Sequence, residues 1–221
     1  MQNTVKNLLD LENNLKIHLN KINISNIPKI VAVSKTFKID KILPLIEHGH
    51  VDFGENKIQE ALDKWSSVKS NFHNIKLHMI GKLQTNKVKF LIPLFDYFHS
   101  LDNLKLARKI SEEEIKKKTK IKIFIQVNIG NEDQKSGVNV DYLDEFYSIC
   151  VKELNLDIIG LMCLPPNNEK TLFYFSEMQK LTKKLNLNEL SLGMSNDYID
   201  ATEYGSTFVR IGSKIFGQRS K

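Results

Sequence analysis

Residues 121–128 read Ile121-Lys122-Ile123-Phe124-Ile125-Gln126-Val127-Asn128, a nearly continuous run of β-favouring apolar side chains. Such a run is typical of a strand buried on both faces, as in a parallel sheet covered by helices. Comparable runs recur along the chain, separated by segments with helical spacing. They lie at 29–35, 51–53, 76–80, 96–101, 157–163, 189–193 and 207–211. The sequence therefore predicts about eight strand–helix units.

A further helix is expected before the first strand. Apolar residues recur every three or four positions from Leu8 to Ile22, so residues 2–25 are predicted to be helical and to stop before Pro28. After the first strand, helical periodicity returns at residues 39–49 and ends on a glycine. The N-terminal helix is thus an addition to the repeating units.

Eight strand–helix units favour an α/β fold with a closed (β/α)8 barrel of the TIM type. The alternative is an open, doubly wound sheet, which usually carries a glycine-rich turn after its first strand. Ser34-Lys35-Thr36-Phe37 contains no glycine. No linker, low-complexity stretch or repeat divides the chain, so residues 1–221 are expected to form one domain.

Composition excludes several functional classes. The net charge is +6, but the lysines are interleaved with acids, as in Ser111-Glu112-Glu113-Glu114-Ile115-Lys116-Lys117-Lys118, which we interpret as a solvated helix face. No basic stripe carries stacking aromatics, so nucleic-acid binding is not expected.

The sequence shows neither a signal peptide nor a membrane-spanning stretch. Cys150 and Cys163 are too few for a disulfide framework and lack metal-site spacing. We expect a cytoplasmic, monomeric protein without a metal ion.

Polar residues at the predicted strand ends are the candidates for chemistry, because the active sites of barrels lie there. Lys35 follows a buried strand with one serine between, so its amine is expected at the barrel mouth with a pKa lowered by desolvation. Such a lysine is a candidate Schiff-base nucleophile. A structural lysine whose stem covers the strand end remains the alternative.

The last two strands add a candidate anion site. Gly193-Met194-Ser195-Asn196-Asp197 and Gly212-Ser213 place hydroxyls and backbone N–H groups before helical segments, which suits a phosphate. The alternative is that these glycines only cap helices. Arg210 lies two residues before Gly212 and could donate to a ring nitrogen between lysine and phosphate. Pairing of Arg210 with a carboxylate stays open as an alternative.

These residues belong to a set of motifs in which the chain resembles the pyridoxal phosphate homeostasis proteins of the YggS/PROSC type. Seven blocks carry the resemblance between residues 30 and 219. They are Val31-Ala32-Val33-Ser34-Lys35-Thr36; Phe53-Gly54-Glu55-Asn56 with Gln59-Glu60; His78-Met79-Ile80-Gly81 with Leu83-Gln84 and Asn86-Lys87; Lys135-Ser136-Gly137; Gly160-Leu161-Met162; Leu192-Gly193-Met194-Ser195; and Gly205-Ser206-Thr207, Val209-Arg210-Ile211-Gly212 and Phe216-Gly217.

The resemblance implies a barrel similar to that of alanine racemase, with pyridoxal 5′-phosphate (PLP) bound to Lys35 as a Schiff base. It implies that Arg210 faces the pyridine nitrogen and that Asn56 lies near the lysine and the ring. It also implies a role for Lys135, in a flexible loop, in passing the cofactor on. The residues implied to hold the phosphate are the Met194 backbone, Ser195, Gly212 and Ser213. Lys57, Lys82 and Asn196 depart from the family pattern.

Three functions follow from these residues. The first is a carrier that holds PLP for intracellular homeostasis and delivers it to PLP-dependent apo-enzymes, without robust catalysis. The second is an amino-acid racemase, which needs an acid–base group on each face of its substrate. In alanine racemase the second group is a tyrosine from the partner's added β-domain, and this chain ends at Lys221, just past the eighth strand. The third is a barrel for another phosphorylated metabolite, with Lys35 structural.

Overall fold

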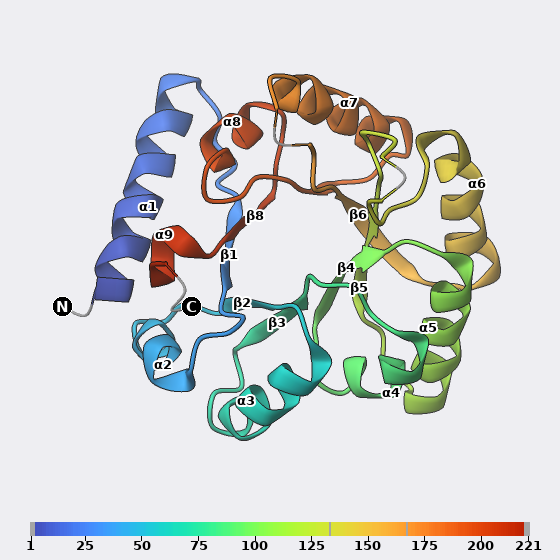
Figure 1. The fold of residues 1–221 in the computed structure, drawn as a ribbon, viewed down its shortest axis with the longest axis horizontal. Helices are drawn as coiled ribbons and strands as arrows, with labels where there is room; N and C mark the ends of the chain where they lie inside the picture. The colour runs from blue at the N-terminus through green and yellow to red at the C-terminus, as the bar shows by residue number, and fades with distance from the viewer. Residues whose placement is uncertain (1–2, 133, 167, 219–221) are drawn as a thin grey trace.

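Eight parallel strands close into a barrel in sequence order (Figure 1). The computed structural model describes residues 3–132, 134–166 and 168–218. The strands are β1 Lys29–Val33, β2 Asp52–Glu55, β3 Lys76–Met79, β4 Tyr97–Leu101, β5 Lys122–Gln126, β6 Asp157–Met162, β7 Glu189–Ser191 and β8 Phe208–Ile211. β8 pairs with β1, with Val31 opposite Arg210. The predicted (β/α)8 barrel is therefore confirmed, and the open-sheet alternative is wrong.

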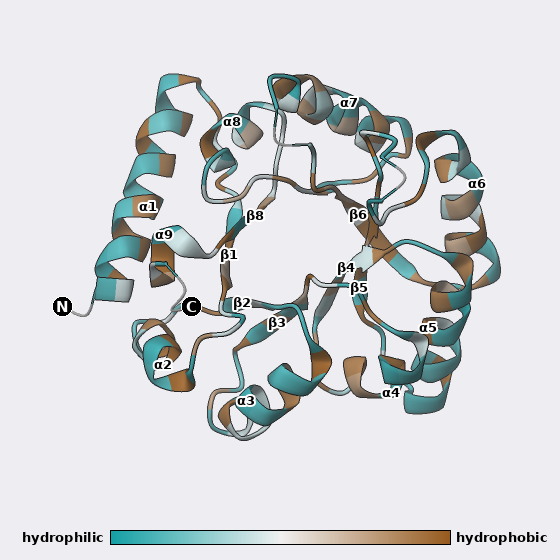
Figure 2. Cartoon of the chain, viewed as in Figure 1, coloured by the Kyte–Doolittle hydropathy of each residue, from teal (hydrophilic) through white to brown (hydrophobic). Residues whose placement is uncertain are grey.

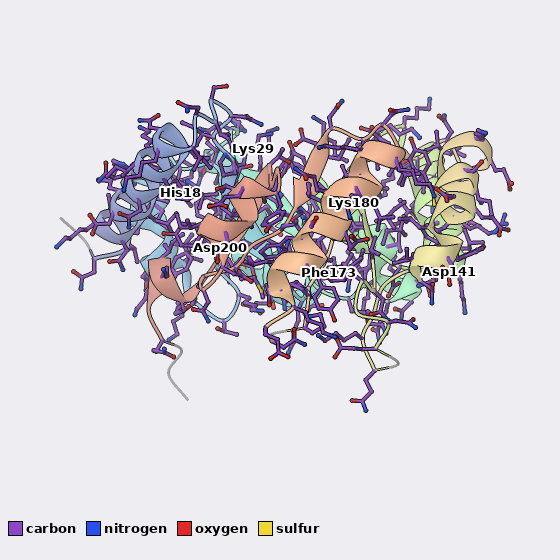
Figure 3. The ribbon with its side chains drawn as sticks, turned by 90° about the horizontal axis from the view of Figure 1, so that it is seen from above. His18, Lys29, Asp141, Phe173, Lys180 and Asp200 are labelled. Carbon is purple, nitrogen blue, oxygen red and sulfur yellow. The ribbon has the colours of Figure 1, made fainter. Side chains whose placement is uncertain are left out.

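Helices surround the barrel and carry both polar and apolar residues around their circumference (Figure 2). They are α1 Asn3–Lys21, α2 Ile39–Glu47, α3 Ile58–Asn71, α4 Val88–Leu91, α5 Leu104–Lys117, α6 Leu143–Ser148, α7 Thr171–Lys184, α8 Tyr198–Glu203 and α9 Ser213–Phe216; Thr85–Lys87 and Val140–Tyr142 are 3-10 turns and Ile149–Glu153 is a π-helical turn. In Figure 3, Lys29 begins β1 at the upper edge, and α7 runs upward from Phe173 to Lys180. The helix thus runs back against the direction of the strands.

The N-terminal helix is confirmed but ends four residues earlier than predicted. α1 stops at Lys21 because Asn23 takes a left-handed conformation with φ of 56°. The Ile24 N–H then donates to the Leu19 carbonyl at 3.0 Å, which closes the helix end. α1 packs on α2 and α9, and Asn7 Nδ2 donates to the Ile215 carbonyl at 2.9 Å. The added helix therefore covers the seam where the barrel closes.

The apolar core has two parts. The larger lies between strands and helices, and a smaller one fills the barrel interior with Val31, Tyr97, Phe124, Met162 and Phe208. Alternate residues of a strand point to opposite faces, so β1, β4, β5, β6 and β8 contribute to both parts. Phe98 on β4, for example, belongs to the outer part, whereas its neighbour Tyr97 belongs to the inner one.

Both cysteines are buried and free. Burial raises the pKa of the Cys150 thiol to about 12 and that of the Cys163 thiol to about 12. In the described part of the chain, no three metal-ligating side chains gather into a possible metal site. Over the same residues, no helix combines the length and the apolar character needed to cross a membrane.

The acid-rich run on α5 corrects one sequence interpretation. Glu113 and Glu114 are 7% and 2% exposed, so a solvated helix face does not describe them. Glu114 accepts from the Ile121 N–H at 2.9 Å and from Lys120 Nζ at 2.9 Å. The carboxylate thus satisfies a buried backbone amide just before β5, a role that charge patterning does not reveal.

Candidate functional site

A pocket of about 530 Å³ opens at the carboxyl ends of the strands. Its lining comes from the last residues of β1 and β8 and from residues that follow β1, β2, β3, β6, β7 and β8. All seven residues predicted for a cofactor line it: Lys35, Asn56, Met194, Ser195, Arg210, Gly212 and Ser213. Residues from both ends of the chain therefore meet around one space.

The wall that carries Lys35 is held by buried side chains. Lys35 is half-buried and follows Ser34, whose hydroxyl donates to Glu55 Oε1 at 2.6 Å. Lys64 Nζ on α3 donates to the same Glu55 oxygen at 2.9 Å and to the Ser34 carbonyl at 2.9 Å. Trp65 Nε1 is a third donor to Glu55 Oε1, at 2.9 Å. The fully buried Glu55 carboxylate thus ties the end of β1 to α3.

The residue after Lys35 is held in an uncommon conformation. Thr36 has φ of 69°, a left-handed backbone that β-branched residues rarely adopt. Its N–H donates to Glu60 Oε1 at 2.5 Å, and Lys64 Nζ donates to the same oxygen at 3.0 Å. Burial raises the pKa of Glu60, but these two hydrogen bonds, together with the positive charges of Lys64 and Lys57, outweigh it and hold the pKa below its usual value. The backbone on both sides of Lys35 is therefore fixed through α3.

Arg210 forms part of the buried floor of the pocket, on β8 next to β1. It is 5% exposed, and Nη1 donates to the Ser191 carbonyl at 2.7 Å and to Ser191 Oγ at 2.6 Å. Nη2 donates to the Cys163 carbonyl at 2.9 Å. These partners are neutral, and Arg210 forms no ion pair with a carboxylate of the described residues, so the structure does not support the alternative of a paired arginine. Burial lowers the pKa of Arg210 to about 10, which leaves the guanidinium protonated at neutral pH.

The loops after β7 and β8 present backbone groups to the pocket. Gly193 has φ of 87°, and a Cβ there would lie 2.8 Å from Ala201 Cβ, so the turn requires glycine. The Met194 N–H donates to Asp197 Oδ1 at 2.6 Å. The N–H groups of Ser195 and Gly212 have no acceptor among the described residues. Two of the predicted anion donors are thus open, while the Met194 amide is occupied.

Asn56 carries a polar atom without a partner. Its Oδ1 is buried and accepts no hydrogen bond from any described residue. Asn56 follows β2, and the end of β3 approaches its backbone closely, since a Cβ on Gly81 would lie 2.2 Å from the Asn56 carbonyl oxygen. An unsatisfied buried acceptor in a pocket wall indicates a place for a donor on a bound molecule.

Some residues lie elsewhere or were missed. Lys135 pairs with Glu132 at 2.6 Å and is not one of the described residues that line the pocket. Sequence reasoning located the end of β6 but not the wall that follows it, formed by Leu164, Pro165 and Pro166. The adjacent prolines just after a strand end were an available signal, because they stiffen a loop. The hydrogen bonds that Glu55 accepts were also missed, although Glu55 lies in the motif Phe53-Gly54-Glu55-Asn56.

The chain is similar to known proteins along most of its length. The family model described as "Alanine racemase, N-terminal domain" matches residues 7–220. A curated "Pyridoxal phosphate homeostasis protein" of Aquifex aeolicus is 36% identical over 203 residues, which cover 88% of each chain. The namesake of Escherichia coli strain K12 is 33% identical over 199 residues, covering 86% of this chain and 85% of the relative.

Solved structures agree with these sequence matches. PipY of Synechococcus elongatus without PLP superposes with a TM-score of 0.87 at 27% identity, covering 98% of this chain and all of PipY. The structure titled "with PLP bound" gives a TM-score of 0.78 and covers 92% of this chain. Alanine racemase from Corynebacterium glutamicum, at 16% identity and a TM-score of 0.66, shows the fold alone and is covered over 56% of its length. By the extent of these matches, the chain belongs to the pyridoxal phosphate homeostasis protein family, within the group that shares the alanine racemase N-terminal barrel.

Proposed function

We propose that this chain binds PLP in the pocket and holds it as a Schiff base on Lys35. The observation that carries the proposal is that one pocket is lined by Lys35, Asn56, Arg210 and the β7 and β8 loops. The names of the relatives and the PipY structure with PLP support the choice of cofactor. The pocket volume of about 530 Å³ is in the range of small-molecule sites.

The donors of the pocket suit the parts of this cofactor. The open N–H groups of Ser195 and Gly212, with the hydroxyls of Ser195 and Ser213, would hold the phosphate. The Met194 amide would join them once Asp197 turns away from it. The buried Asn56 Oδ1 would gain a partner from a hydroxyl of the bound molecule.

Arg210 favours holding the cofactor over catalysis. Three of its five N–H groups donate to Ser191 and Cys163, which leaves Nε–H and the second Nη2–H as donors for a bound molecule. A guanidinium donates and does not give up its proton, so a pyridine nitrogen facing it stays unprotonated. PLP supplies an electron sink for carbanions, and an unprotonated ring weakens that sink.

These properties suit a homeostasis protein better than an amino-acid racemase. We propose that the chain acts in the cytoplasm as a monomer, storing PLP and releasing it to PLP-dependent apo-enzymes. A carrier needs a reversible bond to the aldehyde and a phosphate site, and both sets of groups are present in the pocket.

Borohydride trapping tests the proposal. PLP is added to the purified protein, borohydride is applied, and peptides are mapped by mass spectrometry. One pyridoxyl group is expected on Lys35. Lys35→Ala should fold, because residue 35 lies beyond the strand, and should acquire no label in the pocket peptides. Lys57→Ala is the matched control, since Lys57 is exposed and follows Asn56 directly; it should be labelled on Lys35 like the parent. Equal labelling of the parent and Lys35→Ala proteins would overturn the assignment.

A further inference from the structure

Five polar side chains form one hydrogen-bonded chain through the barrel interior, which we call the barrel chain. Asp52 Oδ1 lies 2.9 Å from His78 Nε2, and His78 Nδ1 lies 3.0 Å from His99 Nε2. His99 Nδ1 lies 3.0 Å from Ser191 Oγ, which accepts from Arg210 Nη1 at 2.6 Å. The barrel chain therefore links β2, β3, β4, β7 and β8.

Packing fixes the two imidazole rings of the barrel chain. His78 stacks on Tyr97 with ring centroids 4.3 Å apart and an interplanar angle of 4°. His99 stacks on Phe124 at 4.3 Å and 23°, and Phe208 meets its edge at 5.8 Å. Both histidines are 0% exposed. Each ring nitrogen thus has one fixed partner and no access to solvent.

The two ends of the barrel chain set its direction. Arg210 can only donate and a carboxylate can only accept. With neutral rings, His78 must therefore carry its proton on Nε2 and donate to Asp52, and its Nδ1 accepts from His99 Nε2–H. His99 Nδ1 then accepts from the Ser191 hydroxyl, whose oxygen accepts from Arg210 Nη1. Every donor in the barrel chain points away from Arg210.

This order requires both histidines to be neutral. Burial lowers the pKa of His78, against the opposing effect of Asp52. Burial also lowers the pKa of His99 well below its usual value, and the charge of Arg210, like the charge that His78 would carry if protonated, acts in the same direction. With neutral rings, each hydrogen bond of the barrel chain has one proton, so every donor in it has an acceptor.

We propose that Asp52, His78, His99 and Ser191 are positioning residues that hold the Arg210 guanidinium in the pocket, and that Asp52 sets the tautomers of both histidines. Asp52 lies at the opposite end of the barrel, with a side chain 14% exposed. It lines a second pocket of about 300 Å³ together with Glu12, Lys16 and His50. A change at that end is thereby transmitted to the residue that faces the ligand.

Nitrogen-15 NMR of histidine-labelled, ligand-free protein tests the tautomers directly. His78 and His99 are both expected as neutral Nε2–H forms. In Asp52→Ala, the terminal acceptor is gone, so His99 should shift toward a mixture of tautomers although it does not touch residue 52. Glu12→Ala removes a carboxylate from the same pocket outside the barrel chain, and the His99 signal should stay unchanged. A doubly protonated or Nδ1–H form in the parent, or an unmoved His99 in Asp52→Ala, overturns the proposal.

A double-mutant cycle tests the effect on Arg210, and this part rests on the proposed function. PLP affinity, followed by absorbance, should fall about two- to thirtyfold in Asp52→Ala. Ser191→Ala removes the hydroxyl that joins His99 to Arg210 but keeps the backbone carbonyl of residue 191. In that background, the further substitution Asp52→Ala should change PLP affinity no more than Glu12→Ala does. If the losses of PLP affinity caused by Asp52→Ala and Ser191→Ala are additive, the positioning role is overturned. Absence of PLP binding by the parent would instead refute the proposed function, while the NMR result still decides the order of the barrel chain.

Discussion

The two walls of the pocket are built on different principles. The wall around Lys35 is tied by side chains, because the buried Glu55 carboxylate binds Ser34, Lys64 and Trp65 at once. The wall formed by the β7 and β8 loops depends on backbone, with a glycine turn at Gly193 and the open Gly212 amide. A lysine that reacts must be placed, whereas an incoming anion needs donors that are not yet used. The difference therefore matches the roles that we propose for the two walls, covalent attachment at Lys35 and phosphate binding at the β7 and β8 loops.

The largest expected effect is the loss of the tie behind Lys35. Glu55→Ala should lower the free energy of unfolding by about 3–5 kcal/mol, because it leaves the buried Trp65 N–H without its acceptor and removes one of the two carboxylates, Glu55 and Glu60, that pair with Lys64. The Lys64 side chain is 8% exposed. Urea unfolding measures the change. Glu112→Ala removes a carboxylate whose side chain is 65% exposed and should leave the unfolding midpoint where it is. Equal effects of the two substitutions would show that the Lys35 wall is not held in this way.

A smaller loss is expected on the backbone-built wall. Gly193→Ala should cost about 2–4 kcal/mol, since it combines a positive φ with a Cβ only 2.9 Å from Tyr198 Cα. Gly205→Ala is the matched comparison, because its φ of 80° is similar but its Cβ would meet nothing closer than Gln179 Nε2 at 3.4 Å. That substitution should cost about 1–2 kcal/mol. If thermal unfolding gives the same loss of stability for both substitutions, the close approach at Gly193 does not contribute to the cost.

The smallest effect concerns charge on the anion side. Asp197 lines the pocket and accepts from the Met194 amide. Asp197→Asn keeps an acceptor oxygen and removes a negative charge, so PLP should bind about two- to fivefold more tightly. Asp200→Asn makes the same change on exposed α8 surface, at a residue labelled in Figure 3, and should not alter the titration. Weaker binding by Asp197→Asn would mean that the carboxylate helps the ligand instead of opposing it.

The features that sequence could predict are those with a period or a strand-end position. Runs such as 121–128 predicted the strands, and the rule that loops after barrel strands carry function brought Lys35, Arg210 and Ser195 together. The end of α1 was overestimated because apolar spacing continues to Ile22, whereas the left-handed Asn23 stops the helix.

The supporting contacts could not be predicted for physical reasons. Glu55 meets Lys64 and Trp65 only because α3 folds back over β2, and the sequence does not determine how α3 is placed on that strand. His99 lies on β4, where all five residues are buried, so the pattern of burial does not distinguish the interior face from the helix-facing one. Only the closed barrel shows that His99 faces Ser191 across the interior.

The burial of both cysteines has a consequence for chemical selectivity. With a pKa of about 12, Cys150 and Cys163 exist as thiolates in only on the order of one molecule in 10⁵ at neutral pH. Thiolates compete with amines for aldehydes and are the species that oxidants attack. The two buried thiols therefore do not compete for a carbonyl compound that enters the pocket, and an amine is the nucleophile that reacts with it there.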